Sequence, residues 1–327
     1  MLRRPAAALA SLPLVALAIA GCGDDDAPAG ASGGRPSVVV TTNVLGDVVS
    51  NLVGDLADVE VIMPAGSDPH EFQASPQQAQ AMREADALIA NGAGFEAGFV
   101  DSIEAAEQDG VPTFEATDGV ETLQLDESVE AHADEEGGEA GGEDEHGDEG
   151  VDPHFFTDPA RMATATQAIG DFLVDQVPTL DTPTFDGQVE ATVDELRTLD
   201  GEVEQTLSVV PAERRTLVTN HEVFGYLADR YGFDVVGAVI PAGTTQAEPS
   251  AAELDELAHT IEERGVPAIF VETSSPTRLA DALANEVGDV EVVELFTESL
   301  GLEGSGGDTY AGMMRTNADR IADALAG

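Results

Sequence analysis

Short runs of apolar and β-branched residues alternate along most of the chain with stretches that are apolar on one side only. The short runs predict strands in both halves, at Ser37–Thr42, Val59–Met63, Ala87–Asn91, Val111–Phe114, Thr216–Asn220, Asp234–Ile240, Ala268–Val271 and Val290–Leu295. The one-sided stretches predict helices at Leu45–Val53, Pro76–Ala85, Phe95–Glu107, Asp158–Gln176, Val223–Tyr231, Ala251–Arg264, Pro276–Glu286 and Tyr310–Leu325. This strand–helix rhythm predicts an α/β fold with two similar lobes, each a parallel sheet flanked by helices.

One helix candidate is longer than either lobe needs. Apolar residues recur every three or four positions from Val189 to Leu207, and the helix should begin near Thr184. At the usual rise per residue it would be about 36 Å long, enough to touch both lobes. We therefore predict an N-terminal α/β lobe at 36–183, a rigid linking helix at 184–208 and a C-terminal α/β lobe at 209–327.

The N-terminus has the form of a secretory signal. Arg3 and Arg4 precede an apolar run that is too short for a comfortable membrane span, and Ala-Gly stands directly before Cys22, the only cysteine. That junction resembles the lipobox of bacterial lipoproteins; the alternative is an ordinary signal peptide with an incidental cysteine. We predict a signal peptide at 1–21 and a lipidated, flexible N-terminus at 22–35, anchoring an extracytoplasmic protein to the cell membrane on its periplasmic or cell-surface side.

Charge narrows the range of partners. The chain has 64 acidic residues against 13 basic ones, all of them arginine, for a formal net charge of −51. Such a surface repels nucleic acid and anionic lipid, so we expect neither as a partner. Residues 126–150 are almost entirely Glu, Asp, Gly and Ala and predict a disordered insertion, in which His132 and His146 offer weak metal sites.

The tripeptide Asp-Pro-His occurs twice, ending at His70 and His154, in a chain with six histidines. Proline fixes its own backbone angle φ and restricts the residue before it, so the backbone that carries each imidazole has few accessible conformations. His221 directly follows a predicted strand, and Asp308 lies in a glycine-rich stretch before the last helix. Ligands of open parallel sheets bind beyond the carboxyl ends of strands, and three imidazoles with one carboxylate suit zinc.

Each candidate also has a structural interpretation. His221 could pack at a strand end, and Asp308 could be the N-cap of the last helix. Glu272 and Glu222 are rival carboxylates that could support the site from behind the ligands, whereas His259 lies on a solvated helix face.

Several of these motifs, in order, resemble the solute-binding lipoproteins of bacterial zinc and manganese ABC importers. The resemblance runs from about Pro36 to the C-terminus and rests on Pro69-His70-Glu71-Phe72, on Asp152-Pro153-His154-Phe155-Phe156-Thr157-Asp158-Pro159, on Asn220-His221-Glu222-Val223-Phe224-Gly225 and on Gly307-Asp308-Thr309-Tyr310. Phe156 and Ala74 depart from the family pattern without removing a ligand. The resemblance implies two α/β lobes joined by a rigid helix, with a metal between them held by His70, His154, His221 and Asp308. It also implies zinc rather than manganese, because the third motif carries a histidine and not a glutamate.

We therefore predict a monomeric receptor, not an enzyme, that captures Zn²⁺ and delivers it to an ABC permease in the membrane. The alternatives are the same role for Mn²⁺ or Fe²⁺, a secreted zinc-dependent hydrolase, and a metal-independent adhesin lipoprotein. A hydrolase needs an open metal position and a nearby base. Four protein ligands leave no such position, and the chain has no His-Glu-x-x-His.

Overall fold

The computed structural model describes residues 34–125 and 150–327. The predicted signal peptide, nearly all of the tether and the acidic insertion lie outside the described residues, and so do Cys22, His132 and His146. Within the described ranges, no helix has both the length and the hydropathy that a membrane crossing requires.

The first sheet is parallel throughout and has the strand order β2-β1-β3-β4. Its strands are β1 (Ser37–Val40), β2 (Asp58–Val61), β3 (Ala87–Ala90) and β4 (Thr113–Glu115). Along β1, successive side chains point to opposite faces of the sheet, as β geometry requires. Val38 and Val40 belong to the core under α1 (Asn43–Val53), whereas Val39 packs with α2 (Pro76–Arg83) and α3 (Val100–Gln108) on the other face. Both faces are covered, which explains the unbroken apolar runs of β1 and β3.

The second sheet repeats this arrangement. Its strands are β5 (Thr216–Thr219), β6 (Asp234–Ala238), β7 (Ala268–Glu272) and β8 (Glu291–Leu295), all parallel, in the order β6-β5-β7-β8. The helices around it are α7 (Gly225–Tyr231), α8 (Ala251–Arg264), α9 (Arg278–Val287) and α10 (Tyr310–Ala326). If β5 is renumbered as the first strand of its half, the two strand orders are identical. The predicted fold class, two similar α/β lobes, is confirmed.

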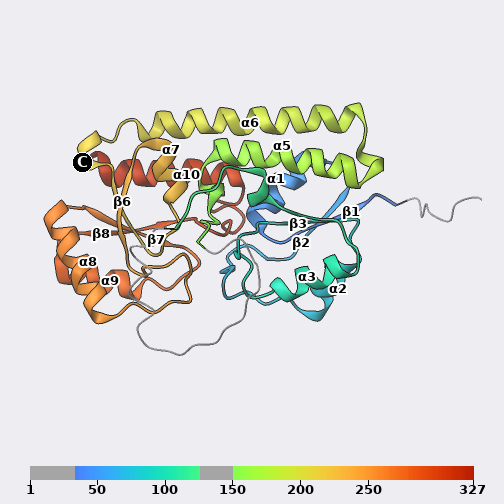
Figure 1. Ribbon diagram of the computed structural model, residues 1–327. Helices are drawn as coiled ribbons and strands as arrows, with labels where there is room; N and C mark the ends of the chain where they lie inside the picture. The colour runs from blue at the N-terminus through green and yellow to red at the C-terminus, as the bar shows by residue number, and fades with distance from the viewer. Residues whose placement is uncertain (1–33, 126–149) are drawn as a thin grey trace, which may run out of the picture. The chain divides into compact units, whose positions relative to one another are not determined.

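Two long helices pack against each other, and the second of them extends past both sheets (Figure 1). They are α5 (Pro159–Gln176) and α6 (Pro183–Leu207), and each starts with a capping side chain followed by proline, Asp158-Pro159 and Thr182-Pro183. Helix α6 packs on α5 and α1 near its start and on α10 further along. At the α5 contact a side chain on Gly170 would collide with Val189, so the two helices approach closely. Short 3₁₀ turns complete the chain at Ala116–Gly119, Phe155–Thr157, Pro178–Leu180 and Ala212–Arg214.

A single hydrophobic cluster passes from one sheet to the other beneath α6. It contains Val38 and Val40 of the first sheet, Leu217 and Phe270 of the second, and apolar residues of α6 along its whole length. The long helix is therefore part of a shared core.

One predicted helix start was wrong. The expected helix from Phe95 begins only at Val100, because the preceding residues form a turn with positive backbone φ at Gly92, Ala93 and Gly94. This turn lies beside the candidate metal centre described next.

Candidate metal centre

The two Asp-Pro-His segments form matching turns. In each, the aspartate Oδ1 accepts a hydrogen bond from the backbone N–H of the histidine two residues later, at 2.9 Å for Asp68 with His70 and 2.9 Å for Asp152 with His154. This is the Asx turn that aspartate favours. Combined with the fixed φ of proline, it sets the direction in which each imidazole leaves the chain. His70 is 3% exposed and His154 is fully buried.

His221 follows β5 and is fully buried. The Thr219 hydroxyl donates to the His221 carbonyl at 2.7 Å, and the next N–H, that of Glu222, donates to Ala242 at 3.0 Å. These two bonds hold the peptide group that joins His221 to Glu222, just beyond the carboxyl end of the strand.

The fourth group is Glu298, three residues after β8. It is fully buried in the run Phe296–Leu300. Asn317 of α10 makes hydrogen bonds with both the N–H and the carbonyl of Phe296, while Asn43 of α1 accepts from the Leu300 N–H at 2.6 Å. The carboxylate is thus held from elements at both ends of the chain.

Asp308, the carboxylate expected from sequence, is not part of this cluster. It is exposed, and its Oδ2 accepts from the Gly304 N–H at 2.9 Å within its own loop. The N-cap of α10 is Thr309, so the capping interpretation of Asp308 was also wrong. Glu298 is the correction to this part of the predicted ligand set.

Three imidazoles converge on one carboxylate oxygen. Glu298 Oε1 lies 2.8 Å from His70 Nε2, 3.0 Å from His154 Nε2 and 3.3 Å from His221 Nε2. One candidate ligand atom from each of the four residues can be chosen so that all lie within 4.8 Å of one another. The first sheet's half supplies His70 and His154, and the second sheet's half supplies His221 and Glu298.

Two further carboxylates contact the far sides of two imidazoles. Asp152 Oδ1 lies 2.7 Å from His154 Nδ1, and Glu272 Oε1 makes a very short contact with His221 Nδ1. Glu272 also accepts from Asn220 Nδ2 at 3.1 Å. If each Nδ1 carries the proton, each Nε2 presents its lone pair to the pocket, and ligand basicity increases. Glu272 therefore lies where a supporting carboxylate is expected, whereas Glu222 lines a neighbouring cavity with Asp152 and Phe224.

The buried carboxylates and imidazoles of the cluster shift one another's pKa. Burial alone lowers the pKa of His154 and His221, but carboxylates overcome this effect: Asp152 and Glu298 raise the pKa of His154, and Glu272 and Glu298 raise that of His221 well above its usual value. Burial alone raises the pKa of Glu298, but the three imidazoles hold it well below its usual range. The carboxylates thus favour the protonated forms of His154 and His221, with which a bound metal would compete.

Two buried polar atoms in the cluster have no hydrogen-bond partner among the described residues. They are Glu298 Oε2 and His221 Nε2, although the latter is within ion-pairing distance of Glu298 Oε1. Buried polar atoms are normally satisfied. A cation bound among these atoms would satisfy both, and three nitrogens with one oxygen form a complete tetrahedral set for zinc.

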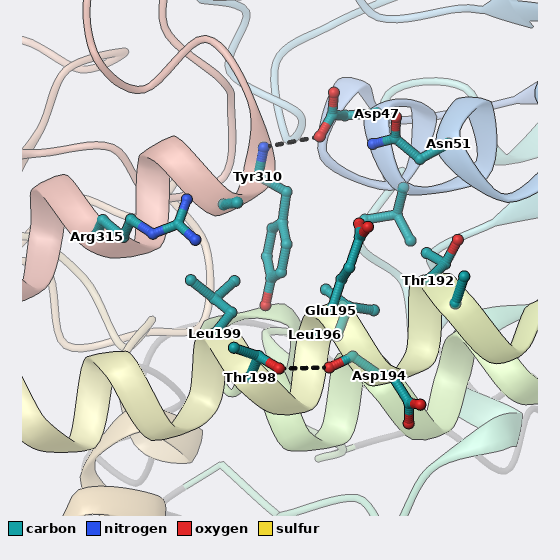
Figure 2. Close-up of a pocket in the computed structure, with 13 residues that line it drawn as sticks. Asp47, Asn51, Thr192, Asp194, Glu195, Leu196, Thr198, Leu199, Tyr310 and Arg315 are labelled. Carbon is teal, nitrogen blue, oxygen red and sulfur yellow. Dashed lines mark hydrogen bonds between the residues drawn. The ribbon is translucent and has the colours of Figure 1, made fainter.

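A surface cavity of about 410 Å³ is formed by residues of α1, α6 and α10 and includes none of these four residues (Figure 2). There Asp47 of α1 accepts from the Tyr310 N–H at the start of α10 at 2.9 Å, which links elements of the two halves. His259, expected on a solvated face, is exposed on α8.

Comparison with known proteins supports a metal-related family. The family model described as zinc-uptake complex component A, periplasmic (ZnuA), matches residues 38–324. The zinc-binding protein TroA of Treponema pallidum is 31% identical over 309 residues, covering 90% of this chain and 91% of TroA. The manganese-binding lipoprotein MntA of Halalkalibacterium halodurans is 29% identical over 316 residues, 95% of this chain and 96% of MntA. The structure of periplasmic zinc-binding TroA superposes with a TM-score of 0.77 at 29% identity, covering 90% of this chain and 100% of that one.

Proposed function

The chain belongs to the ZnuA family of metal-binding, solute-binding proteins of ABC transporters, and on that premise we propose that its cargo is Zn²⁺. Members of this family are receptors and not enzymes, and the general role, a metal-binding receptor of an importer, follows from membership. Relatives are named for zinc or for manganese, so the choice of ion rests on this chain's own residues.

The convergence of three imidazole nitrogens on a single carboxylate supports zinc. Nitrogen-rich sites favour later first-row metals, and zinc is bound much more tightly than manganese by the same donors. Manganese prefers oxygen ligands and more of them, whereas the cluster offers one carboxylate, Glu298, beside the imidazoles. Fe²⁺ lies close to manganese in the same order and is disfavoured for the same reason.

The way in which the metal is captured and released follows from which half of the chain supplies each ligand group. Each half of the chain contributes two groups to the site, and the shared core beneath α6 opposes a wide separation of the halves. We infer that small shifts of the loops carrying His70 and Glu298 open the site to the permease. Lipidation of Cys22 would keep the receptor at the outer face of the membrane; relatives named as lipoproteins support this part of the proposal.

A competitive titration tests the metal assignment. Protein stripped with a chelator is titrated with zinc and then with zinc against a large excess of manganese. We expect one tight zinc site that manganese fails to displace, and loss of that site in His154→Ala. His259→Ala is the matched control, because this imidazole is exposed on α8 and far from the cluster in sequence. Equal or tighter manganese binding at the single site would overturn the zinc assignment.

A further inference from the structure

The turn between β3 and α3 folds around a buried carboxylate. Glu96 is 3% exposed. Its Oε1 accepts from the Asn91 N–H at 2.7 Å and from the Thr41 hydroxyl at 2.6 Å, and its Oε2 accepts from the Gly92 N–H at 3.3 Å. Thr41 follows β1 and Asn91 follows β3, so this one side chain joins the carboxyl ends of two neighbouring strands to the turn.

The backbone of this turn is unusual. Gly92, Ala93 and Gly94 have φ values of +89°, +51° and +72°, and alanine rarely adopts a positive φ. A side chain at Gly92 would also overlap Thr117 and Glu115. Consecutive N–H groups turned toward one anion form the kind of backbone concavity known as a nest. Strained backbone persists where surrounding contacts enforce it, and here the enforcing group is the carboxylate of Glu96.

The turn also positions Phe95, the residue directly before Glu96. The ring of Phe95 lies edge-on to two candidate ligands, with centroid distances of 5.5 Å to His70 and 5.8 Å to His154. Asn91 reaches the same place from behind, because its Nδ2 donates at 3.0 Å to the carbonyl of Pro153, directly before His154. Both Asp-Pro-His segments are therefore in contact with a turn that Glu96 keeps in shape.

Burying the Glu96 carboxylate in this turn costs free energy. Burial raises the pKa of Glu96, and the hydroxyl of Thr41 and the N–H groups of Asn91 and Gly92 offset only part of that effect. Its hydrogen-bond partners carry no formal charge, so the charged form lacks the ion pair that buried charges usually have. In return, the hydrogen bonds of the Glu96 carboxylate keep the turn, and with it Phe95, in a fixed position.

We propose that Glu96 is a positioning residue of the metal centre, fixing through the Asn91–Phe95 turn the separation of the His70 and His154 imidazoles. Their ring centroids are 6.3 Å apart, with Phe95 in contact with both. A fixed separation favours a small ion with four ligands over a larger ion that needs more. The inference rests on the proposed function, since it concerns how selectively that same site binds zinc.

The variant Glu96→Gln tests this with little change in volume. Its amide can still accept from Asn91 or Thr41, but its NH₂ group then faces the Gly92 N–H, a donor against a donor. We expect the zinc dissociation constant to rise about tenfold, the lower end of the effect for groups that support metal ligands. We also expect the zinc-to-manganese affinity ratio to fall and the visible absorption of bound Co²⁺ to change. Glu104→Gln, an exposed charge removal on α3, should leave all three unchanged.

A second variant separates positioning from simple folding. Phe95→Leu leaves the Glu96 contacts intact and removes the ring that contacts both imidazoles. Its cobalt spectrum and zinc affinity should therefore change in the same direction as those of Glu96→Gln. A Glu96→Gln protein that melts earlier but keeps the wild-type zinc affinity and cobalt spectrum would overturn the inference. An unchanged Phe95→Leu spectrum would overturn it even if Glu96→Gln failed to fold. A wild-type protein that binds neither zinc nor cobalt would instead refute the receptor proposal itself.

Discussion

Replacing Glu298 by glutamine should distinguish a metal ligand from a buried structural charge. Glu298 Oε1 faces the Nε2 atoms of all three imidazoles at 2.8, 3.0 and 3.3 Å, and glutamine keeps the shape while removing the charge. Loss of a group that only supports a ligand typically weakens metal binding about 10- to 100-fold. Glu298 supplies the only anion among the four groups, so we expect more than about 100-fold, or about 2.7 kcal/mol.

The same change should affect the metal-free protein in a pH-dependent way. The pKa of His221 is raised in the folded state, so its contribution to stability is fully present below the unfolded value of about 6.5 and is lost as pH rises through the folded value. Without the Glu298 charge, a protonated imidazole in this cluster loses one of its buried partners. Breaking a buried ion pair costs about 3–5 kcal/mol at acid pH, and less at pH 8, where the imidazole can deprotonate. The gap in melting temperature between wild type and Glu298→Gln should therefore widen as pH falls from 8 to 5.

Asp308→Asn is the matched control, since it also removes one carboxylate charge, ten residues further along the chain. Asp308 is exposed, and an exposed change of this kind should stay within about 0.5 kcal/mol. Zinc affinity is measured by competition with a coloured chelator, and stability by calorimetry on chelator-treated protein. A larger loss of zinc affinity in Asp308→Asn than in Glu298→Gln would refute the geometric assignment, and so would a Glu298→Gln protein within threefold of wild type.

Three further outcomes are expected. Zinc affinity should fall as pH drops, because protons compete with the metal for the imidazoles. The fall should begin above the ordinary imidazole pKa of about 6.5, because carboxylates raise the pKa of His154 and His221 despite burial. A zinc affinity that does not change between pH 8 and 5.5 would contradict this. Zinc at about 1,000 times its dissociation constant should add about 4 kcal/mol to the free energy of unfolding, seen as a higher melting temperature that a chelator reverses; unchanged melting would count against selective binding to the folded state. Phe185→Ala, at a fully buried position near the start of α6, should cost about 3–5 kcal/mol in a urea titration, while Val209→Ala, which is 60% exposed, should cost less than about 0.5 kcal/mol; similar losses in both would refute the account of the core.

Much of the fold could be predicted from sequence because its strongest local signals agree with the tertiary structure. The strands β1 and β3 are apolar on both faces, and Ser75-Pro76 and Asp158-Pro159 cap real helices. The start of α3 could not be found this way. Phe95 and the residues after it have an ordinary helical pattern, but the carboxylate of Glu96 turns back onto backbone N–H groups, a tertiary preference that periodicity does not record.

The histidines of the candidate site could be predicted from sequence because histidine is rare in this chain, whereas its carboxylate could not. Histidine occurs six times in the chain, so two Asp-Pro-His tripeptides and a histidine after a strand stand out. Acidic residues number 64, so no single one stands out by type. The strand-end rule that selected His221 applies equally to Glu298, which follows β8 by three residues in an otherwise uncharged run. Proximity to a glycine-rich loop favoured Asp308 instead, and that criterion was the weaker one.

The core that passes beneath α6 has a consequence for how the molecule unfolds. Val38 and Val40, Leu217 and Phe270 belong to the same apolar cluster although they lie in different sheets. Neither half can lose its packing without exposing surface of the other, so unfolding should proceed as one cooperative transition and not as two separate domain transitions. An ion held by side chains from both halves then stabilises the entire cooperative unit. Amide protons far from the metal, on the outer strands of either sheet, would exchange more slowly once it binds.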